Sequence, residues 1–533
     1  MISAYTGTQV RQAEEPLLAS GLGDVLMQRA AHGLANAVIR ERRSRGLGIY
    51  GASVSVLTGK GNNGGDGLYA ASFLAARGMR TTAVLTGDTA HPQALAAFER
   101  AGGRVHRLDG TAPAALAAEA ARADVVIDAV LGTGANGGLR GSAADLVSAV
   151  AVLMANGNGQ TFVVACDLPS GVDADTGDVF QPVLPADLTV TFGGAKSGLL
   201  ADPGADYAGR VLVVPIGIEE HLPQPSLRRL DEADLARLLP HPARRAHKYS
   251  RGVLGVVAGS VDYPGAAVLA CRGALAAGVG MVRYLGPPQV ADLVRQACPE
   301  VVCSTGSVAD NRVQAWLVGS GMGPEHHEQL QRARDAVGSG LPVVADAGAL
   351  PALPETLGPH IVLTPHAGEL ASLLQRLGGS EDRDAVEAGT LAAVRRASEL
   401  TGATVLLKGA TTLVAAPSGD VFSQADGTPW LATAGSGDVL AGVIGALLAQ
   451  AGNDVGRFSK EGVEPDVRWA AIAALGAALH GLAGRAASEV LSGGPIAAGR
   501  IADSIPYTWG KVSTLSNDGL GNVTVTPSSY GRH

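Results

Sequence analysis

The chain has 533 residues, of which 46% are apolar and 4% aromatic, and its formal net charge is −8 at pH 7. This length predicts two or more domains, and an acidic balance without a long basic run does not favour nucleic-acid binding. Four scattered cysteines without C-x-x-C spacing favour neither a disulfide framework nor a zinc site, and they fit a reducing cytoplasm. The apolar segments 439–448 and 469–482 are short and interrupted, and the first 15 residues do not resemble a signal peptide, so we expect no membrane association.

The first half of the chain alternates between helical and strand-like segments. Residues 8–43 have helical spacing with a break at 21–23, and a series of short apolar strands follows. The predicted strands are 53–57, 82–85, 125–127, 162–165, 188–192 and 211–214. Such alternation predicts an α/β fold with a doubly wound, mostly parallel sheet, in which ligands bind at the carboxyl ends of the strands.

Three polar loops follow strands in this half, at residues 58–67, 132–138 and 166–173. The first two contain G-x-G-x-x-G, which alone is weak evidence for a dinucleotide site. Asp66 stands at a helix start, where it would repel a pyrophosphate. Asn63, Asp128 and Ser170 offer amide, carboxylate and hydroxyl oxygens, and one carboxylate suits a monovalent cation better than Ca²⁺. The alternative is that these three side chains only satisfy turns; we favour a cation site because they fall at one edge of the sheet.

The charged and proline-containing segment 218–228 interrupts the pattern, and a second α/β run starts near residue 252. Strands are predicted at 253–258, 282–285, 315–318, 343–345, 361–363, 404–407 and 413–416. We place a domain boundary near Pro225. The expected organisation is a domain at 1–224, a second domain at 225–500, and an irregular tail at 501–533, after a stretch rich in Gly and Ser.

A glycine loop at 433–437 leads directly into an apolar helix. Backbone amides in such a loop, together with the positive end of the helix dipole, favour phosphate oxygens. Asp438 at this position has two interpretations. It caps the helix, or it is a general base that takes a proton from a hydroxyl while the loop holds a phosphoryl group.

Three motifs in the second half, "TPHAGEL" (364–370), "KGATT" (408–412) and "TAGSGDVLAG" (433–442), occur in the order found in ADP/ATP-dependent NAD(P)H-hydrate dehydratases, which the segment resembles. The resemblance implies a ribokinase-like α/β domain with Asp438 as catalytic base. His366 is either a helix-start residue or a substrate contact. The implied substrate contacts are Ala266, Gly321, His366 and Asp438, and the implied nucleotide contacts are Lys408, Gly409, Ala410, Thr411, Thr412, Gly435, Ser436 and Gly437.

Three further motifs, "GKGNNGGDGL" (59–68), "IDAVLGTG" (127–134) and "CDLPSGVDADTG" (166–177), resemble the NAD(P)H-hydrate epimerase family and imply a Rossmann-like domain. Residues 27–31 (MQRAA) depart from that family, which usually has an acidic second and a glycine fifth residue. Asp167 is implied as a catalytic acid/base or as a positioning group, and K⁺ is implied at Asn63, Asp128 and Ser170. The implied substrate contacts are Asn62, Asn63, Gly64, Gly65, Asp66, Gly132, Thr133, Gly134, Ala135, Asn136, Gly137, Gly138 and Asp167.

Together the resemblances imply repair of hydrated NADH and NADPH. One domain epimerises the R and S hydrates, and the other phosphorylates the hydroxyl at the expense of ADP (or ATP) with Mg²⁺ and eliminates phosphate, leaving AMP. We expect a cytoplasmic homo-oligomer with hydrated cofactor and adenine nucleotide as its partners. The alternative is a ribokinase-type small-molecule kinase fused to a non-catalytic Rossmann-like binding module, which would release a phosphorylated product.

Overall fold

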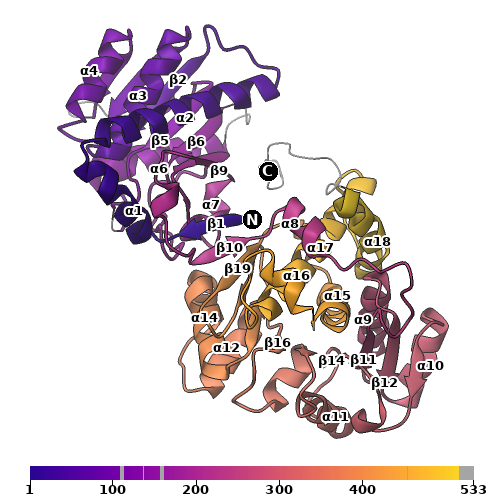
Figure 1. Ribbon diagram of the computed structural model, residues 1–533. Helices are drawn as coiled ribbons and strands as arrows, with labels where there is room; N and C mark the ends of the chain where they lie inside the picture. The colour runs from indigo at the N-terminus through magenta and orange to yellow at the C-terminus, as the bar shows by residue number, and fades with distance from the viewer. Residues whose placement is uncertain (109–112, 136, 157–160, 453, 515–533) are drawn as a thin grey trace. The chain divides into compact units, whose positions relative to one another are not determined.

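Strands and helices alternate along the computed structural model, which describes residues 1–108, 113–135, 137–156, 161–452 and 454–514 (Figure 1). The chain forms two units with their own internal packing. The first contains residues 3–226, and the second begins at residue 227 and also includes Met1 and Ile2. Each unit is an α/β layer structure, as the alternation of elements predicts.

The first unit has a fully parallel sheet in the order β4-β3-β2-β5-β6-β7-β9. Its register pairs Val54 with Val125 and Val164 with Leu188. The order reverses between β2 and β5, which is where doubly wound sheets bind ligands. The strands are β2 (Ser53–Thr58), β3 (Arg80–Leu85), β4 (Arg104–Arg107), β5 (Val125–Ala129), β6 (Phe162–Cys166), β7 (Leu188–Phe192) and β9 (Arg210–Val214).

Helices cover both faces of this sheet because its central strands, β2, β5, β6 and β7, are almost entirely buried on both sides. One buried cluster joins the sheet to α1 (Gly7–Ala19), α2 (Gly23–Ser44), α3 (Asn62–Ala76) and α4 (Pro92–Arg100). Another joins it to α5 (Pro113–Ala120) and α6 (Gly141–Ala155). The remaining elements are β1 (Ile2–Tyr5), which pairs with β8 (Ala195–Lys196), then η1 (Ser197–Leu199), α7 (Ala205–Ala208) and η2 (Glu219–His221).

The second unit has a sheet in the order β13-β12-β11-β14-β15-β16-β17-β18-β19-β10. It is parallel from β13 to β17, antiparallel through β18 and β19, and parallel again at β10. The strands are β10 (Leu227–Arg229), β11 (Val253–Val257), β12 (Met281–Leu285), β13 (Val302–Ser304), β14 (Ala315–Val318), β15 (Val343–Ala345), β16 (Ile361–Leu363), β17 (Thr404–Leu407), β18 (Thr412–Ala415) and β19 (Val421–Gln424).

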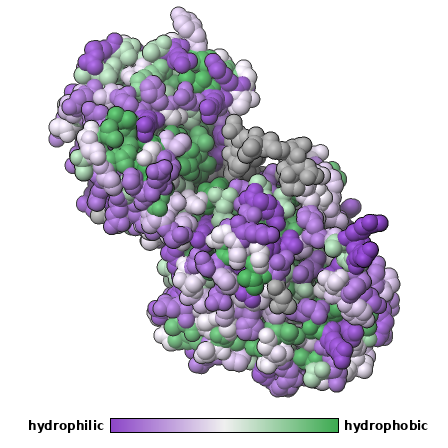
Figure 2. All heavy atoms as spheres, in the orientation of Figure 1, coloured by the Kyte–Doolittle hydropathy of each residue, from purple (hydrophilic) through white to green (hydrophobic). Residues whose placement is uncertain are grey.

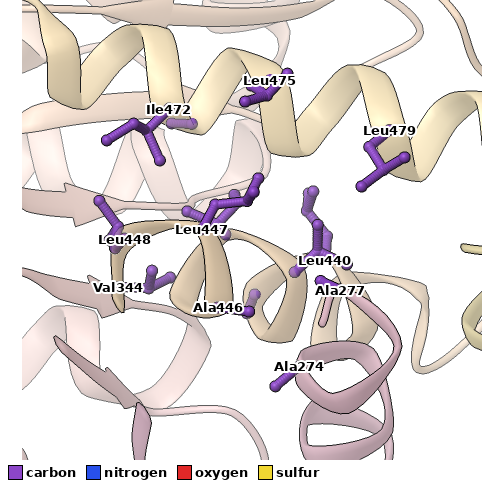
Figure 3. Close-up of a cluster of buried hydrophobic side chains, with 14 of the residues drawn as sticks. Ala274, Ala277, Val344, Leu440, Ala446, Leu447, Leu448, Ile472, Leu475 and Leu479 are labelled. Carbon is purple, nitrogen blue, oxygen red and sulfur yellow. The ribbon is translucent and has the colours of Figure 1, made fainter. Parts of the chain in front are cut away.

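The helices of this unit pack around α15, which lies against both α9 and α17 (Figure 3). A Cβ on Gly442 of α15 would lie 2.2 Å from the carbonyl oxygen of Ala270 in α9, so only glycine allows this approach. The helices are α8 (Glu232–Leu238), α9 (Pro264–Ala276), α10 (Pro288–Ala297), α11 (His327–Val337), α12 (Ala367–Arg376), α13 (Arg383–Ala388), α14 (Thr390–Thr401), α15 (Ser436–Ala451), α16 (Val455–Ser459), α17 (Arg468–Val490) and α18 (Ala498–Thr514), with short η3 (Val308–Asp310), η4 (Ala347–Ala352) and η5 (Pro429–Leu431).

The expectation of an irregular tail from residue 501 is wrong for residues 501–514, which belong to α18. Ile501, Ile505 and Val512 of this helix are buried in the main cluster of the second unit. Their spacing places them on one face of the helix, so packing against α17 and α9 stabilises a segment that its Gly- and Ser-rich surroundings conceal.

Among the described residues, α17 alone is long and apolar enough to cross a membrane by length and composition. However, 83% of its most apolar window is buried inside the unit, where Ile472, Leu475 and Leu479 face the core (Figure 3). On the face of the molecule seen in Figure 2, hydrophilic and hydrophobic side chains are interspersed in both units. The burial of α17 is therefore that of a core helix.

Candidate active sites

The first site begins where the glycine loop after β2 turns into α3. A Cβ on Gly59 would lie 2.0 Å from the carbonyl oxygen of Val130, and one on Gly64 would lie 2.0 Å from that of Gly59. These glycines are therefore needed for the loop to pack on itself and on the segment after β5. The packing fixes the start of α3, which carries Asn62, Asn63 and Asp66.

The three predicted cation ligands are connected through the backbone of Leu131. The amide of Asn63 donates to the Leu131 carbonyl at 2.9 Å, and the Leu131 N–H donates to Ser170 Oγ at 2.8 Å. Ser170 in turn donates to Asp128 from its hydroxyl at 2.6 Å and from its backbone at 2.8 Å. Asp128 is fully buried; burial raises the pKa of this carboxyl, and the Ser170 hydrogen bonds oppose the rise.

Asn63 Oδ1 has no solvent contact and no hydrogen-bond donor within the described part of the chain. A buried amide oxygen of this kind requires a partner such as water or a cation. The donor set of one carboxylate with amide and hydroxyl oxygens therefore fits a monovalent ion.

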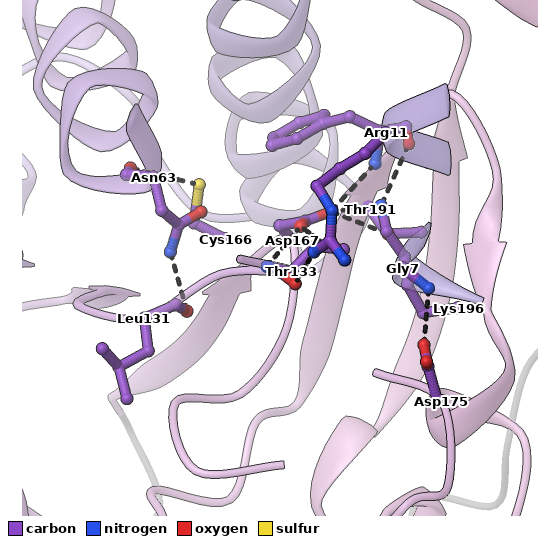
Figure 4. A network of polar contacts seen from close by, with 11 residues as sticks. Gly7, Arg11, Asn63, Leu131, Thr133, Cys166, Asp167, Asp175, Thr191 and Lys196 are labelled. Carbon is purple, nitrogen blue, oxygen red and sulfur yellow. Dashed lines mark hydrogen bonds and ion pairs between the residues drawn. The ribbon is translucent and has the colours of Figure 1, made fainter. Parts of the chain in front are cut away.

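Asp167, directly after β6, is surrounded by donors (Figure 4). Its Oδ1 accepts hydrogen bonds from Lys196 Nζ at 2.5 Å, from Thr191 Oγ1 at 3.1 Å and from the Phe192 N–H at 3.4 Å. Its Oδ2 accepts from the hydroxyl and the N–H of Thr133. Burial alone would raise the pKa of Asp167, but the Lys196 ammonium and these hydrogen bonds lower it, so Asp167 is a fixed anion.

Two further carboxyl groups belong to the same electrostatic environment. Burial raises the pKa of Asp66 well above its usual value, and the charges of Asp167 and Glu14 add to the rise. Burial also raises the pKa of Glu14 on α1, partly opposed by Lys196. Asp66 Oδ1 is buried without a hydrogen-bond partner among the described residues. Sequence reasoning did not single out Lys196 or Glu14; a lysine within the otherwise uncharged run 188–200 was the available signal for Lys196.

The loop after β5 brings Thr133 to Asp167, and Arg11 binds the Thr133 carbonyl at 2.7 Å. Gly132 lies against Asn63, and Ala135 closes a turn on the Gly132 carbonyl at 2.9 Å. The other predicted contact glycines have different surroundings. Space is open beside Gly134 and Gly137, Gly138 lies against Phe180, and Gly65 faces the ring of His91. Asn136 lies outside the described residues.

The second site is built at the start of α15. Gly435 has a left-handed φ of 88° and serves as the N-cap residue, so the helix begins at Ser436 and Asp438 lies in its first turn. The first backbone N–H groups of a helix have no partner within the helix and can bind an anion. Behind this turn, His480 Nε2 lies 3.3 Å from Ser436 Oγ; burial lowers the pKa of His480 to about 4, so its ring is neutral.

Asp438 is not the N-cap residue, which disfavours the simple capping interpretation. Burial raises its pKa to about 6, and the charge of Asp346 adds to the rise, whereas a hydrogen bond from Ser320 and the charge of Lys408 oppose it. A carboxyl group with a pKa near the working pH is suited to act as a general base.

Lys408 connects the "KGATT" turn to the glycine loop. Its Nζ lies 2.9 Å from Asp346 Oδ1 and 3.8 Å from Glu369 Oε2, and a Cβ on Gly437 would lie 3.6 Å from it. Burial alone would lower the pKa of Lys408, but Asp346 and Glu369 raise it, so the ammonium is retained. Beside it, Gly409, Ala410 and Thr411 form the bend that leads into β18, whose first residue is Thr412.

Asp346 is the residue that the sequence analysis missed in this site. It is 3% exposed and also accepts hydrogen bonds from Ser320 Oγ at 3.0 Å and Thr364 Oγ1 at 2.8 Å. Its position directly after the apolar strand β15 was the available signal. Asp346 fixes Lys408 and adds to the field at Asp438.

His366 is the N-cap of α12 and forms a capping box with Glu369. Its Nδ1 accepts from the Gly368 and Glu369 N–H groups at 3.1 and 3.3 Å. The helix-start interpretation therefore describes its local role, and the remaining face of the ring lines a cavity of about 280 Å³ that Glu369 also lines. Among the other predicted substrate contacts, a Cβ on Gly321 would lie 2.6 Å from that of Ala266, so these two positions are in direct contact.

Comparisons with known proteins match each half of the chain to a family model. Residues 254–506 match the family model described as NAD(P)H-hydrate dehydratase, and residues 23–198 match that of YjeF-related protein N-terminus. A crystal structure of ADP/ATP-dependent NAD(P)H-hydrate dehydratase from Bacillus subtilis co-crystallized with ATP/Mg²⁺ is 25% identical, covering 54% of this chain and 98% of that chain with a TM-score of 0.44.

Two relatives carry the name bifunctional NAD(P)H-hydrate repair enzyme Nnr. The one from Mycobacterium tuberculosis (strain ATCC 25618 / H37Rv) is 43% identical over 84% of this chain and 89% of its own length. The one from Moorella thermoacetica is 35% identical over 93% of this chain and 95% of its own length. On this evidence the chain belongs to the family of bifunctional NAD(P)H-hydrate repair enzymes.

Proposed function

We propose that the second unit dehydrates hydrated NADH and NADPH at the expense of ADP. The observation that supports this most directly is the cluster at the start of α15, where a buried carboxyl with a pKa of about 6 lies close to a lysine and a helix N-terminus. Asp438 takes the proton of the substrate hydroxyl, and the hydroxyl oxygen forms a bond to the terminal phosphorus of ADP as the bond to AMP breaks. Phosphate then leaves with the electrons of its C–O bond, the neighbouring ring carbon loses a proton to solvent, and the ring double bond is restored.

The residues around this centre hold the reactants. Lys408 and the amides of Gly435, Ser436 and Gly437 bind the phosphoryl oxygens, because an ammonium and a helix start both favour negative charge. Mg²⁺, when bound with the nucleotide, neutralises phosphate charge. Asp346 and Glu369, the carboxylates beside Lys408, would hold this Mg²⁺, since Mg²⁺ is usually bound through one or two carboxylates.

For the first unit we propose epimerisation of the R and S hydrates. The support is the cluster of Asp66, Asp167 and Lys196 at the carboxyl ends of the strands, beside the predicted substrate loops. K⁺ is proposed at Asn63, Asp128 and Ser170, where the buried Asn63 oxygen without a donor fits it. When bound, K⁺ supplies a positive charge that favours substrate oxygens. The proposed domains are 1–224 and 225–500, the latter extended through α18.

The test is incubation of the full chain with a mixture of R and S hydrates of NADH, ADP and Mg²⁺, followed by absorbance of the restored dihydronicotinamide. We expect complete recovery and one free phosphate per NADH. Recovery that stops when the S hydrate is consumed would contradict the epimerase assignment. Release of a phosphorylated product without phosphate would instead support the small-molecule kinase alternative.

The cytoplasmic location and the homo-oligomeric state of the protein remain predictions. The four cysteines are all free, which is consistent with a reducing cytoplasm. We propose a homo-oligomer, and measurement of the solution mass by light scattering would test it.

A further inference from the structure

The first site contains two carboxyl groups, Asp66 on α3 and Asp167 after β6, whose pKa values are shifted in opposite directions. Asp167 follows β6 and accepts hydrogen bonds from Lys196, Thr191, Phe192 and Thr133, so both of its oxygens are occupied by donors. Lys196 is 1% exposed, and its Nζ also donates to Thr191 Oγ1 at 3.0 Å and to the Phe192 carbonyl at 3.1 Å. The Lys196 ammonium and these hydrogen bonds therefore lower the pKa of Asp167 and favour its carboxylate form.

Asp66 differs from Asp167 in its hydrogen bonding and in the charges around it. It lies one turn after Asn63 on the same face of α3, and positions three apart on a helix are neighbours. Its Oδ1 is shielded from solvent and finds no donor among the residues that the structure describes. An ionised carboxylate there would be near the charges of Asp167 and Glu14 and would have no hydrogen-bond donor at its buried Oδ1. The protonated form removes this cost and leaves a hydroxyl group that needs an acceptor.

From this geometry we propose that Asp66, and not Asp167, donates the proton that starts epimerisation, with the fixed Asp167–Lys196 pair as a positioning group. The inference rests on the proposed epimerase function of the first unit. Pairs of carboxyl groups whose surroundings separate their proton affinities are the usual basis for an acid and an ionised partner in one site.

The chemistry balances in two steps. The Asp66 carboxyl gives its proton to the hydroxyl oxygen of the hydrate, and the C–O bond breaks with its electron pair leaving on water. The ring nitrogen lone pair then forms a C=N bond, and the resulting cation is stabilised by the nearby Asp167 carboxylate. Water adds to the opposite face of the same carbon, the electron pair returns to nitrogen, and the proton that the water loses restores the Asp66 carboxyl through solvent.

The test uses the full chain and the pure R hydrate of NADH, with ADP and Mg²⁺, so that epimerisation limits NADH recovery. Asp66→Asn should slow recovery from the R hydrate by roughly 10²–10⁴-fold, the usual effect of removing a general acid. Recovery from the S hydrate should be unchanged, and circular dichroism should show a folded chain. The matched control is Asp206→Asn, because burial also raises the pKa of Asp206, but its charged neighbour is Asp202; it should epimerise normally.

Two results would overturn the proposal. One is normal epimerisation by Asp66→Asn; in that case, loss of epimerisation in Glu14→Gln would make Glu14 the donor. The other needs no variant: epimerisation by the wild-type chain in H₂¹⁸O should introduce one labelled oxygen into the new hydroxyl, and complete retention of the original oxygen would exclude the C–O cleavage. A wild-type chain that does not epimerise at all would contradict the proposed function instead.

Discussion

Replacing Asp438 with asparagine should abolish dehydration and at the same time stabilise the second unit. In the folded chain the pKa of Asp438 is raised from 3.8 to about 6. Because the folded state binds the proton more tightly than the unfolded state, its stability decreases as the pH rises through the interval between these values. Above about pH 6 the buried carboxylate costs on the order of 3 kcal/mol, from about 1.4 kcal/mol for each pKa unit.

Asparagine removes this charge but cannot accept a proton. We expect Asp438→Asn to lower the dehydration rate roughly 10²–10⁴-fold. At pH 7.5 the unfolding transition of the second unit should rise by a few degrees, up to roughly 5 °C for an effect of this size. Near pH 4, where the wild-type carboxyl is protonated when folded, the two chains should differ little.

The measurements are dehydration of the S hydrate and scanning calorimetry of the full chain at both pH values. Asp503→Asn is a suitable control because Asp503 forms an exposed pair with Arg272 and should change stability by less than ~0.5 kcal/mol at either pH. Destabilisation by Asp438→Asn at pH 7.5, or an equal effect at both pH values, would refute the reasoning from a buried charge.

Three other substitutions test separate parts of the structure. Lys408→Met should weaken ADP binding and dehydration while epimerisation continues, as measured by calorimetric titration with ADP; unchanged binding would contradict its phosphate role. Asp128→Ala should abolish any stabilisation by KCl relative to a bulky organic cation salt and impair epimerisation; a thermal shift that persists would place K⁺ elsewhere. Gly442→Ala should destabilise the second unit by about 1–3 kcal/mol in urea unfolding, because the added Cβ would meet the Ala270 carbonyl; Gly265→Ala, where space is open, is its control.

The sequence predicted most strands of both sheets, because most of these strands are buried on both faces and are therefore apolar throughout. It missed β10, β13 and β19 in the second unit. It also missed β4 (Arg104–Arg107) in the first, where two of four residues are exposed arginines and pairing with β3 makes the segment a strand. It also missed α18, because burial of Ile501 and Ile505 depends on helices far away in the sequence. A local sequence pattern predicts a helix or strand only where the residues of that segment themselves favour it, without contacts from distant parts of the chain.

The same limit applies to the sites. The proximity of Asn63, Asp128 and Ser170 was predictable because each lies at or just after the carboxyl end of a strand in one parallel sheet, and the structure connects them through Leu131. Lys196 and Asp346 were not predicted, since their importance depends on which carboxyl or ammonium group lies opposite them. Such ion pairs depend on the three-dimensional fold and cannot be read from a short sequence motif.

These two missed residues give both sites the same electrostatic arrangement. Lys196 pairs with Asp167 in one unit, and Lys408 pairs with Asp346 in the other. In each case the paired carboxylate raises the pKa of a second buried carboxyl, Asp66 or Asp438, while the lysine only partly opposes the rise. Burial is the larger cause of each raised pKa, and the paired carboxylate adds to it. The shared arrangement supports the proposal that Asp66 and Asp438 both exchange protons with substrate.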